Sequence, residues 1–90
     1  MSPRFTIITV VLNGEQYIRR CVESVLKQDF ESFEYLIIDG ISKDKTLEIV
    51  GEYAGDARMK VVSEKDKGIY DAMNKGIRMA RGEWIFFLGF

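Results

Sequence analysis

The segment from Phe5 to Leu12 limits the possible folds of this chain more than any other part of the sequence. Its residues are apolar or β-branched almost without interruption, which is typical of a strand buried on both faces of a parallel sheet. Parallel strands cannot be joined by a tight hairpin, so each is followed by a longer crossover that is usually a helix. The segment therefore predicts a parallel α/β architecture.

A helical pattern follows this first strand. Apolar residues recur along one side at helical spacing and charged residues occupy the other, as in an amphipathic helix that packs on a sheet. Asn13 resembles the cap of this helix, with Gln16 three residues later. The apolar side consists of Tyr17, Ile18, Cys21, Val22, Val25 and Leu26.

The alternation of strand and helix continues to the end of the chain. We expect further strands at Phe33 to Ile38, Met59 to Val62 and Trp84 to Leu88. Ser42 or Asp44 is expected to cap the second helix. Gly55 is expected to end the second helix and Gly82 the third. The apolar side of the second helix consists of Leu47, Val50, Tyr53 and Ala54, and that of the third consists of Ile69, Met73, Gly76, Ile77 and Ala80.

The predicted order is β-α-β-α-β-α-β, which right-handed crossovers turn into a three-layer α/β sheet. Residues 1–90 are expected to form a single domain. The apolar strand at Trp84 to Leu88 comes almost at the end of the sequence. We therefore expect a truncated domain or the first piece of a larger one, with a complete small α/β protein as the alternative.

Composition excludes several kinds of function. The net charge is −1, with 13 basic and 14 acidic residues intermixed, so no basic stripe predicts a nucleic-acid partner. The chain has no histidine, so any metal would be a hard, oxygen-bound ion. Cys21 lies on an apolar helical side and is interpreted as a core residue. No run approaches the roughly 20 apolar residues of a membrane span, and a reducing cytoplasm fits the single cysteine.

Three loops are expected to meet at the carboxyl edge of the sheet, where α/β proteins bind ligands. They are Asn13-Gly14, Asp39 to Asp44, and Ser63 to Gly68. Each precedes a helix N-terminus, whose free N–H groups favour an anion such as phosphate. Asp39 could accept a hydrogen bond from a base imide or a ribose hydroxyl, and Asp66 could do similar work from the next loop.

Each of these residues also has a purely structural interpretation. Asp39 could shape a turn with the Ser42 hydroxyl, and Asp44 or Asp66 could cap the helix that follows it. Asn74 could be a solvated helical position, and Gly76 could let the third helix approach the sheet closely. The glycine motifs of dinucleotide-binding proteins and of P-loops are absent, as are a nucleophile elbow and zinc-ligand spacing.

Longer sequence segments resemble family 2 glycosyltransferases. Residues 37–46 resemble the family's I-D-G-x-S-x-D-x-T segment, and residues 63–76 resemble the S-E-x-D-x-G-I-Y-D-A-M-N-K-G segment of a bacterial subgroup. Residues 6–13 resemble the opening strand, and residues 80–85 resemble the A-x-G-x-x-I approach to the metal site. The similarity runs from about Phe5 to Leu88, nearly the whole chain.

This resemblance implies the Rossmann-like, nucleotide-binding half of a GT-A fold. It implies transfer of a sugar, usually with inversion, from a nucleotide diphosphate sugar, with a UDP-sugar as the expected donor. By position, the main chain around Val10 and Val11 would border the base, and Asp39 would bind it. Asp66 would lie near the base or ribose. Asn13 belongs to the first loop of this site, and Asn74 and Lys75 would lie near the donor pocket.

The resemblance also implies components that residues 1–90 do not contain. The family's D-x-D carboxylates, which hold Mg²⁺ or Mn²⁺, follow the fourth strand, and a later carboxylate is the catalytic base. Without a metal to stabilise the departing diphosphate and a base to activate the acceptor hydroxyl, we expect negligible transferase activity from these residues alone. Acceptors in the intact enzyme would be saccharides or lipid-linked, as in bacterial envelope or capsule polysaccharide synthesis at the inner face of the membrane.

Two other interpretations remain open. A non-catalytic nucleotide-binding module would keep the pocket without the chemistry. A receiver-like signalling domain would need paired acids after its first strand and a lysine after its last, and Asn13-Gly14 does not supply the former. In any of these, exposed apolar surface is expected to allow self-association.

Overall fold

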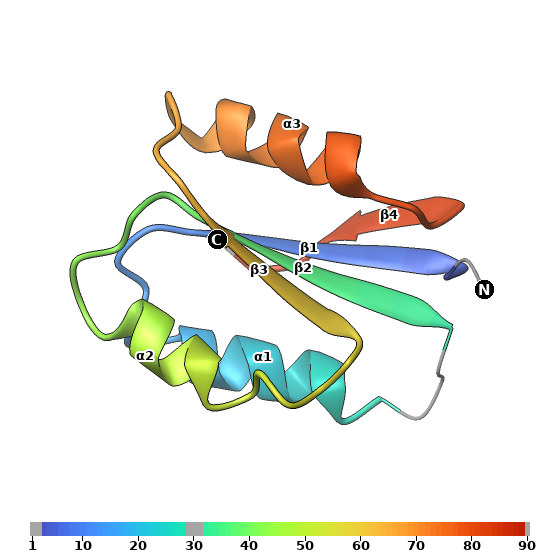
Figure 1. Ribbon diagram of the computed structural model, residues 1–90, viewed down its shortest axis with the longest axis horizontal. Coiled ribbons are helices and arrows are strands. Elements are labelled where there is room, and N and C mark those ends of the chain that lie inside the picture. The colour runs from blue at the N-terminus through green and yellow to red at the C-terminus, as the bar shows by residue number, and fades with distance from the viewer. Residues whose placement is uncertain (1–2, 29–31, 90) are drawn as a thin grey trace.

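A computed structural model describes residues 3–28 and 32–89. Strands and helices alternate along the chain, as the sequence predicts (Figure 1). The strands are β1 (Phe5–Val11), β2 (Phe33–Asp39), β3 (Met59–Ser63) and β4 (Trp84–Phe87). The helices are α1 (Ile18–Leu26), α2 (Thr46–Gly51) and α3 (Ile69–Met79).

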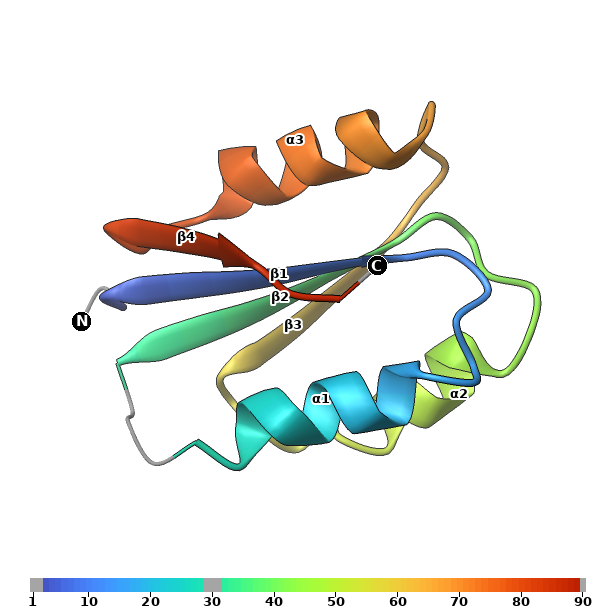
Figure 2. The ribbon, with the colours of Figure 1, turned by 180° about the vertical axis from the view of Figure 1, so that it is seen from behind.

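The four strands form one parallel sheet in the order β3-β2-β1-β4. Helices α1 and α2 cover one face, and α3 covers the other (Figures 1 and 2). The chain moves outward from β1 to β3 and then crosses back to the far side of β1 through α3. This arrangement confirms the predicted three-layer α/β fold. Among the described residues, no helix is both long and apolar enough to cross a membrane.

The core lies on both faces of the central strands β1 and β2. Every residue of β2 is buried, which accounts for its continuous apolar run. The cluster beneath α1 and α2 contains Val11, Ile18, Val22, Val25, Phe33, Tyr35, Ile37, Val50 and Met59. The cluster beneath α3 contains Ile8, Val10, Leu36, Ile38 and Ala72.

Gly76 lets α3 lie close to the sheet, as one interpretation of the sequence predicted. A Cβ atom at this position would lie 2.9 Å from two side-chain carbons of Ile8 on β1. Real Cβ atoms do not approach carbon so closely, so a larger residue would push α3 away from the sheet. Gly76 thereby sets the height of α3 above the strands.

The helix caps were predicted wrongly. Helix α1 begins at Ile18 rather than after Asn13, and no side chain caps α1, α2 or α3. Asn13, Ser42 and Asp66 make hydrogen bonds within and between loops instead, whereas Asp44, one residue before the cap position, accepts from the amide of Thr46 at the start of α2. Their bonds fix the loops at the edge of the sheet, a task that a cap pattern read from one segment cannot reveal.

Other boundaries also differ from the predictions by a few residues: β1 ends at Val11, β2 at Asp39 and β3 at Ser63. Helix α2 ends at Gly51, before a run of turns that reaches Gly55, and α3 ends at Met79. Strand β4 ends at Phe87, one residue earlier than expected. Ile69 and Ile77 were assigned to the packed side of α3, but each is 45% exposed, and Ala72 and Gly76 are its buried residues. The close approach at Gly76 explains the last difference, since it rotates the small residues toward the sheet.

Candidate functional site

The loops after β1, β2 and β3 lie together at the carboxyl edge of the sheet, as predicted (Figure 1). Strand pairing requires this, because Val11 of β1, Asp39 of β2 and Ser63 of β3 occupy adjacent register positions at the strand ends. Residues that follow these three positions are therefore neighbours, although they are far apart in sequence. This edge contains the candidate site.

Asp39 is fully buried at the end of β2. One carboxylate oxygen accepts hydrogen bonds from the Ser42 amide at 2.9 Å and from the Ser63 hydroxyl at 2.8 Å. The other accepts from the Ser42 hydroxyl. These three donors compensate the cost of burying a carboxylate. Asp39 thus shapes the turn with Ser42, as its structural interpretation predicted, and also connects this turn to β3.

The first loop is joined to the second by a set of short hydrogen bonds. The Asn13 amide donates to Ser42 Oγ at 2.8 Å, and the Lys43 amide donates to Asn13 Oδ1 at 2.7 Å. The Gly14 amide donates to Thr46 Oγ1 at 2.8 Å. Asn13 has a φ of 53°, a left-handed conformation that asparagine tolerates better than most residues. The two loops are therefore held as one unit.

Asp44 completes this connection. Its Oδ2 accepts from the Glu15 amide at 3.1 Å, and its Oδ1 accepts from the amide and hydroxyl of Thr46. Burial alone would raise the pKa of Asp44, but the hydrogen bonds from Thr46 and Glu15 outweigh it and lower the pKa. The carboxylate therefore stays charged, as its acceptor role requires.

A pocket of about 210 Å³ opens beside these loops. Its walls are mainly apolar, and Asp66 is the one acidic residue among them. Burial, followed by the nearby Cys21 and Asp44, raises the pKa of the Tyr17 hydroxyl, so this group is neutral and able to donate. The lining residues are Val10, Val11, Leu12, Tyr17, Asp66, Gly68, Ile69 and Ala72.

Asp66 lies next to the end of β2. Its Oδ1 accepts from the Gly68 amide at 3.0 Å, and its Oδ2 lies 2.9 Å from the point where a Cβ on Gly40 would stand. Since Gly40 directly follows Asp39, the two predicted carboxylates belong to one edge of the molecule. A side chain at residue 40 would collide with Asp66, so the glycine permits this closeness.

The structure brings some of the predicted site residues together and leaves others apart. Val10, Val11 and Asp66 line the pocket, while Asp39 and Asn13 fix the loops beside it. Asn74 is exposed on α3 and is not part of the pocket wall. Lys75 donates to the Lys65 carbonyl at 2.8 Å and lies 3.3 Å from Glu64.

Sequence reasoning missed the site roles of Tyr17 and Ser63. Tyr17 was assigned to the packed side of a helix, but it lies before α1 and lines the pocket. Ser63 was treated only as the start of a loop. The signal for Ser63 was its place at the end of a strand, because parallel pairing puts it opposite Asp39.

Metal ligands are not assembled within the part of the chain that the structure describes. No group of three or more histidine, cysteine, aspartate or glutamate side chains there is placed to hold an ion. The oxygens of Asp39 and Asp44 are already engaged by hydrogen-bond donors. The described residues thus do not fit a divalent cation.

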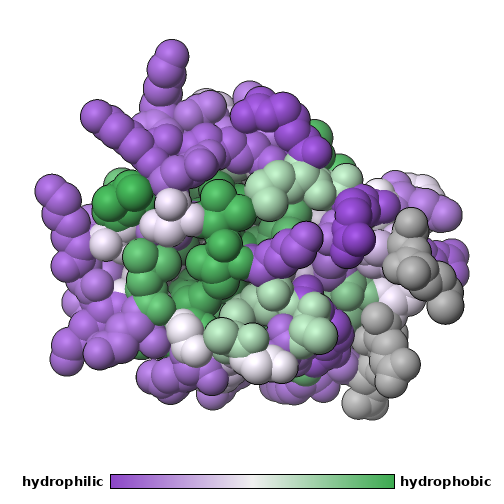
Figure 3. Space-filling view, viewed as in Figure 1, coloured by the Kyte–Doolittle hydropathy of each residue, from purple (hydrophilic) through white to green (hydrophobic). Residues whose placement is uncertain are grey.

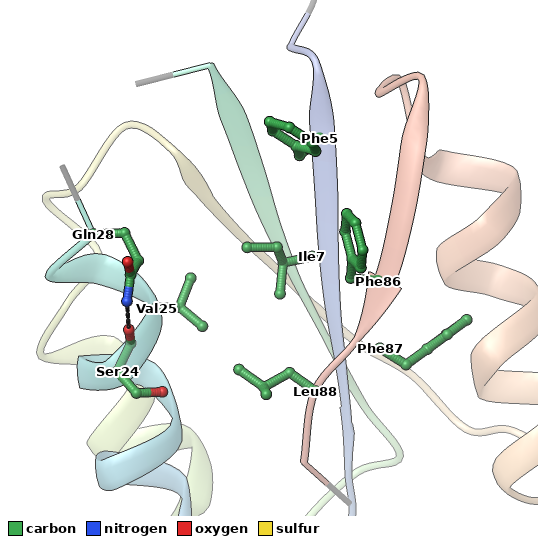
Figure 4. A pocket seen from close by; sticks show the side chains of 8 residues that line it. All are labelled: Phe5, Ile7, Ser24, Val25, Gln28, Phe86, Phe87 and Leu88. Carbon is green, nitrogen blue, oxygen red and sulfur yellow. Dashed lines mark hydrogen bonds between the residues drawn. The ribbon is translucent and has the colours of Figure 1, made fainter. Parts of the chain in front are cut away.

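A larger hollow of about 660 Å³ lies away from this edge, between α1 and the β1–β4 side of the sheet. In Figure 4, Leu88 and Val25 point into it, whereas Phe87 points the other way, toward α3. Its lining contains no charged residue. The residues are Phe5, Ile7, Ser24, Val25, Gln28, Phe86, Phe87 and Leu88. It lacks the convergent polar groups of a specific small-molecule site.

Comparison with known families and proteins gives consistent results. The family described as Glycosyl transferase family 2 matches residues 6–89. A PGL/p-HBAD biosynthesis glycosyltransferase of Mycobacterium bovis is 38% identical over 90 residues, which are 98% of this chain and 35% of that protein. Chondroitin synthase of Escherichia coli is 42% identical over 84 residues, which are 92% of this chain and 12% of that protein.

Solved structures of similar proteins share the fold. The structure of S. aureus TarS 1-349 in complex with UDP-GlcNAc matches with a TM-score of 0.87 and 32% identity, over 96% of this chain and 26% of that one. A mannosyltransferase of Pyrobaculum calidifontis in complex with GDP-Man and Mn²⁺ matches with a TM-score of 0.83 and 27% identity, over 94% of this chain and 26% of that one. The chain therefore spans about a third or less of each of these relatives.

Proposed function

This chain belongs to glycosyl transferase family 2, and on that premise we propose that it binds the nucleoside part of a nucleotide diphosphate sugar, with a UDP-sugar as the donor. The observation that carries the proposal is the pairing of an apolar pocket with two neighbouring carboxylates, Asp39 and Asp66, from separate crossover loops. A nucleoside needs both features, because its base has apolar faces and polar edges.

The size of the pocket supports binding of part of a donor. Pockets for whole drug-sized ligands usually occupy about 300–1,000 Å³. At about 210 Å³, this pocket suits a nucleoside rather than a complete nucleotide sugar. Val10, Val11 and Tyr17 would contact the base, and the sugar and diphosphate would extend beyond the pocket. Relatives with UDP-GlcNAc and GDP-Man bound make this ligand class the natural one to test.

The two carboxylates offer different possibilities to a ligand. A carboxylate has about four lone-pair directions, and three of those on Asp39 are occupied by Ser42 and Ser63. One direction remains for a base imide, and the full burial of Asp39 means that its loop must shift slightly to admit the ligand. Asp66 lines the pocket directly and accepts one amide through Oδ1, and we propose that Oδ2 accepts from a ribose hydroxyl.

The remaining expected donor contacts need a rearrangement. Lys75 would reach a donor only by leaving the Lys65 carbonyl and Glu64. Asn74 would contact a donor only if the ligand extended over α3. We propose that both residues contact the donor only after such a rearrangement, so substitutions there should affect binding less than Asp66→Asn.

Sugar transfer requires more than this pocket. We propose that the longer proteins of this type transfer the sugar with inversion to a saccharide or lipid-linked hydroxyl in the cytoplasm, using Mg²⁺ or Mn²⁺ to stabilise the departing diphosphate. We propose that residues 1–90 form a single donor-binding domain and transfer no sugar by themselves, because the expected metal carboxylates and catalytic base lie outside this sequence.

Titration of the 90-residue chain with UDP, followed by amide chemical shifts, tests the proposal. We expect shifts at Val10 to Leu12 and at Gly68, both with and without Mn²⁺. Asp66→Asn should weaken binding roughly tenfold or more, since a hydrogen bond to a charged group contributes about 1.5–3 kcal/mol. Glu48→Gln also removes one negative charge, at an exposed position on α2, and should have no effect on UDP binding.

Three outcomes would count against the proposal. Shifts confined to residues outside the pocket would remove the site assignment. Equal affinity of UDP for wild type and Asp66→Asn would remove the role of Asp66. Sugar transfer by the 90-residue chain itself, measured with UDP-GlcNAc and a saccharide acceptor, would contradict the proposed lack of activity.

A further inference from the structure

The chain leaves β4 through Leu88 and Gly89, a segment that we call the β4 exit. The Leu88 amide donates to the Ile8 carbonyl of β1 at 2.9 Å. The Leu88 carbonyl accepts a hydrogen bond from the Thr9 hydroxyl at 2.7 Å. Thr9 directly precedes Val10, which lines the candidate pocket. A side chain of β1 thus holds the backbone just beyond the last residue of β4.

The direction of these hydrogen bonds follows from the number of protons available. A threonine hydroxyl has one proton and a carbonyl can only accept, so Thr9 donates to Leu88. The Tyr35 hydroxyl lies 2.6 Å from Thr9 Oγ1 and must therefore donate to it. The Tyr35 hydroxyl of β2 thus donates to Thr9 of β1, and Thr9 donates to the Leu88 carbonyl at the β4 exit. Hydrogen bonds in such a chain strengthen one another.

Thr9 and Tyr35 are both buried beneath α1. Valine and phenylalanine have nearly the same shapes and would fill this space without burying polar atoms. Burying a hydroxyl lowers stability unless it is hydrogen-bonded. The two hydroxyls therefore add a directional contact to the β4 exit that apolar packing would not provide.

The β4 exit is also shaped by Gly89. Its φ of 67° lies in the left-handed region, which favours glycine. A Cβ there would lie 3.0 Å from Cys21 Sγ on α1. The chain consequently leaves β4 on the α1 side of the sheet, as Figure 2 shows.

We propose that Thr9 is a positioning residue for the candidate donor site, because its hydroxyl fixes the β4 exit on the α1 side of β1, one residue before Val10 of the pocket wall. Without this donor, the Leu88 carbonyl keeps only the longer contact from Cys21 Sγ at 3.8 Å, and the exit is held less firmly to β1 beyond Ile8. The role in donor binding rests on the proposed function, whereas the contact between Thr9 and the β4 exit does not.

Amide hydrogen exchange of the nucleotide-free 90-residue chain tests this proposal. Thr9→Val keeps the shape and removes the donor, so the Leu88 and Gly89 amides should exchange at least tenfold faster relative to Ile37 in β2. Tyr35→Phe is the matched control, because it removes a buried hydroxyl of the same series but leaves Thr9 able to donate to Leu88. It should lower overall stability and leave the ratio of Leu88 to Ile37 exchange within about twofold of wild type.

Thr9→Ser keeps the hydroxyl and should restore wild-type exchange at the β4 exit. Equal acceleration by Thr9→Val and Tyr35→Phe would overturn the proposal, because it would indicate a general loss of packing. Should Thr9→Val not fold, Thr9→Ser decides: a ratio within about twofold supports the role of the hydroxyl, and a tenfold rise overturns it. Since no nucleotide is present, failure of UDP binding would count against the proposed function alone.

Discussion

The carboxyl edge of the sheet and the β4 margin are built in opposite ways. At the carboxyl edge, buried polar groups of three loops satisfy one another, as the contacts of Asp39 and Asn13 show. At the β4 margin, large apolar side chains remain uncovered: Trp84 is 57% exposed and Phe86 is 51% exposed. The first region is complete within the described residues, whereas the second would gain stability from contact with another surface.

The two outer strands sharpen this contrast. On the β3 side, an apolar area lies between the hydrophilic surfaces of the helices (Figure 3), and Val61 is 40% exposed there. Lys60, however, interrupts β3 with a charge, which discourages pairing with other strands. Strand β4 consists of Trp84, Ile85, Phe86 and Phe87 and contains no charge at all. The β4 margin is therefore the expected point of self-association.

The largest expected effect comes from breaking the carboxyl edge at Asp39. Asp39→Ala leaves the Ser42 amide and the Ser63 hydroxyl without their buried acceptor. We expect the free energy of unfolding to fall by about 3–4 kcal/mol, measured by urea denaturation. Asp39→Asn keeps the shape and one acceptor oxygen and should lose about half as much. A loss below about 1 kcal/mol for Asp39→Ala would show that water replaces Asp39 and that the edge is not complete.

Glu34 of β2 accepts a hydrogen bond from the amide of Arg81, just before β4. It therefore tests whether buried hydrogen bonds stabilise the start of β4 as they stabilise the carboxyl edge. Burial would raise the pKa of Glu34, but the Arg81 amide, the Thr6 hydroxyl and the Arg81 guanidinium outweigh it and lower the pKa. A lowered folded-state pKa means that this stabilisation is complete above the unfolded value of about 4.3 and is lost as the pH falls through the folded value. Glu34→Gln should cost about 1–2 kcal/mol at pH 7 and less at pH 3.

Urea denaturation at both pH values measures this difference. Glu48→Gln on the surface of α2 is the control and should match wild type throughout. If wild type and Glu34→Gln lost stability in parallel between pH 7 and pH 3, the contacts of Glu34 would contribute nothing to folding.

Ser42 gives a smaller effect at the carboxyl edge. Its hydroxyl donates to Asp39 and accepts from the Asn13 amide, so Ser42→Ala removes one of the hydrogen bonds between the two loops but leaves Asp39 with other donors. We expect a loss of about 1–1.5 kcal/mol in urea denaturation, with faster hydrogen exchange at Asn13. Ser24→Ala removes a hydroxyl that bonds only within α1 and should change neither quantity appreciably. Unchanged exchange at Asn13 would mean that the loops hold together without Ser42.

The sequence predicted the fold well because the fold depends on periodicity. The apolar run at β2 and the helical spacing in α1 are local signals, and both elements formed, although α1 begins at Ile18 rather than after Asn13. The cap at Asn13 was predicted wrongly because Asn13 bonds to a loop 30 positions away rather than to its own helix, and Asp44 divides its oxygens between Thr46 at the start of α2 and the distant Glu15 amide. Such partners depend on which strands lie side by side, and periodicity carries no information about strand order.

For the candidate site, too, local sequence signals were read correctly and contacts between distant residues were missed. Strand ends located Asp39 and the loop that contains Asp66, since the carboxyl ends of parallel strands share one edge, and the family resemblance supplied Val10 and Val11. The sequence could not show that Asp39 is fully occupied by serine donors. It also could not show that Tyr17 would turn from the helix into the pocket wall. Both depend on loop conformations that are fixed only after the sheet has formed.

The smallest effect on stability is expected at the β4 margin, although large apolar side chains are exposed there. Trp84→Lys removes a side chain that is mostly in water already, so the free energy of unfolding should change by less than about 0.5 kcal/mol. The same charge should weaken self-association at least tenfold in sedimentation velocity, because a lysine on an edge strand must be desolvated for the strands to pair. Val61→Lys on β3, the other outer strand, should leave self-association unchanged. A wild-type chain that stays monomeric at millimolar concentration would refute the β4 margin as the point of self-association. Loss of the Trp84 aromatic ring would thus disturb folding less than loss of the carboxylate at Asp39.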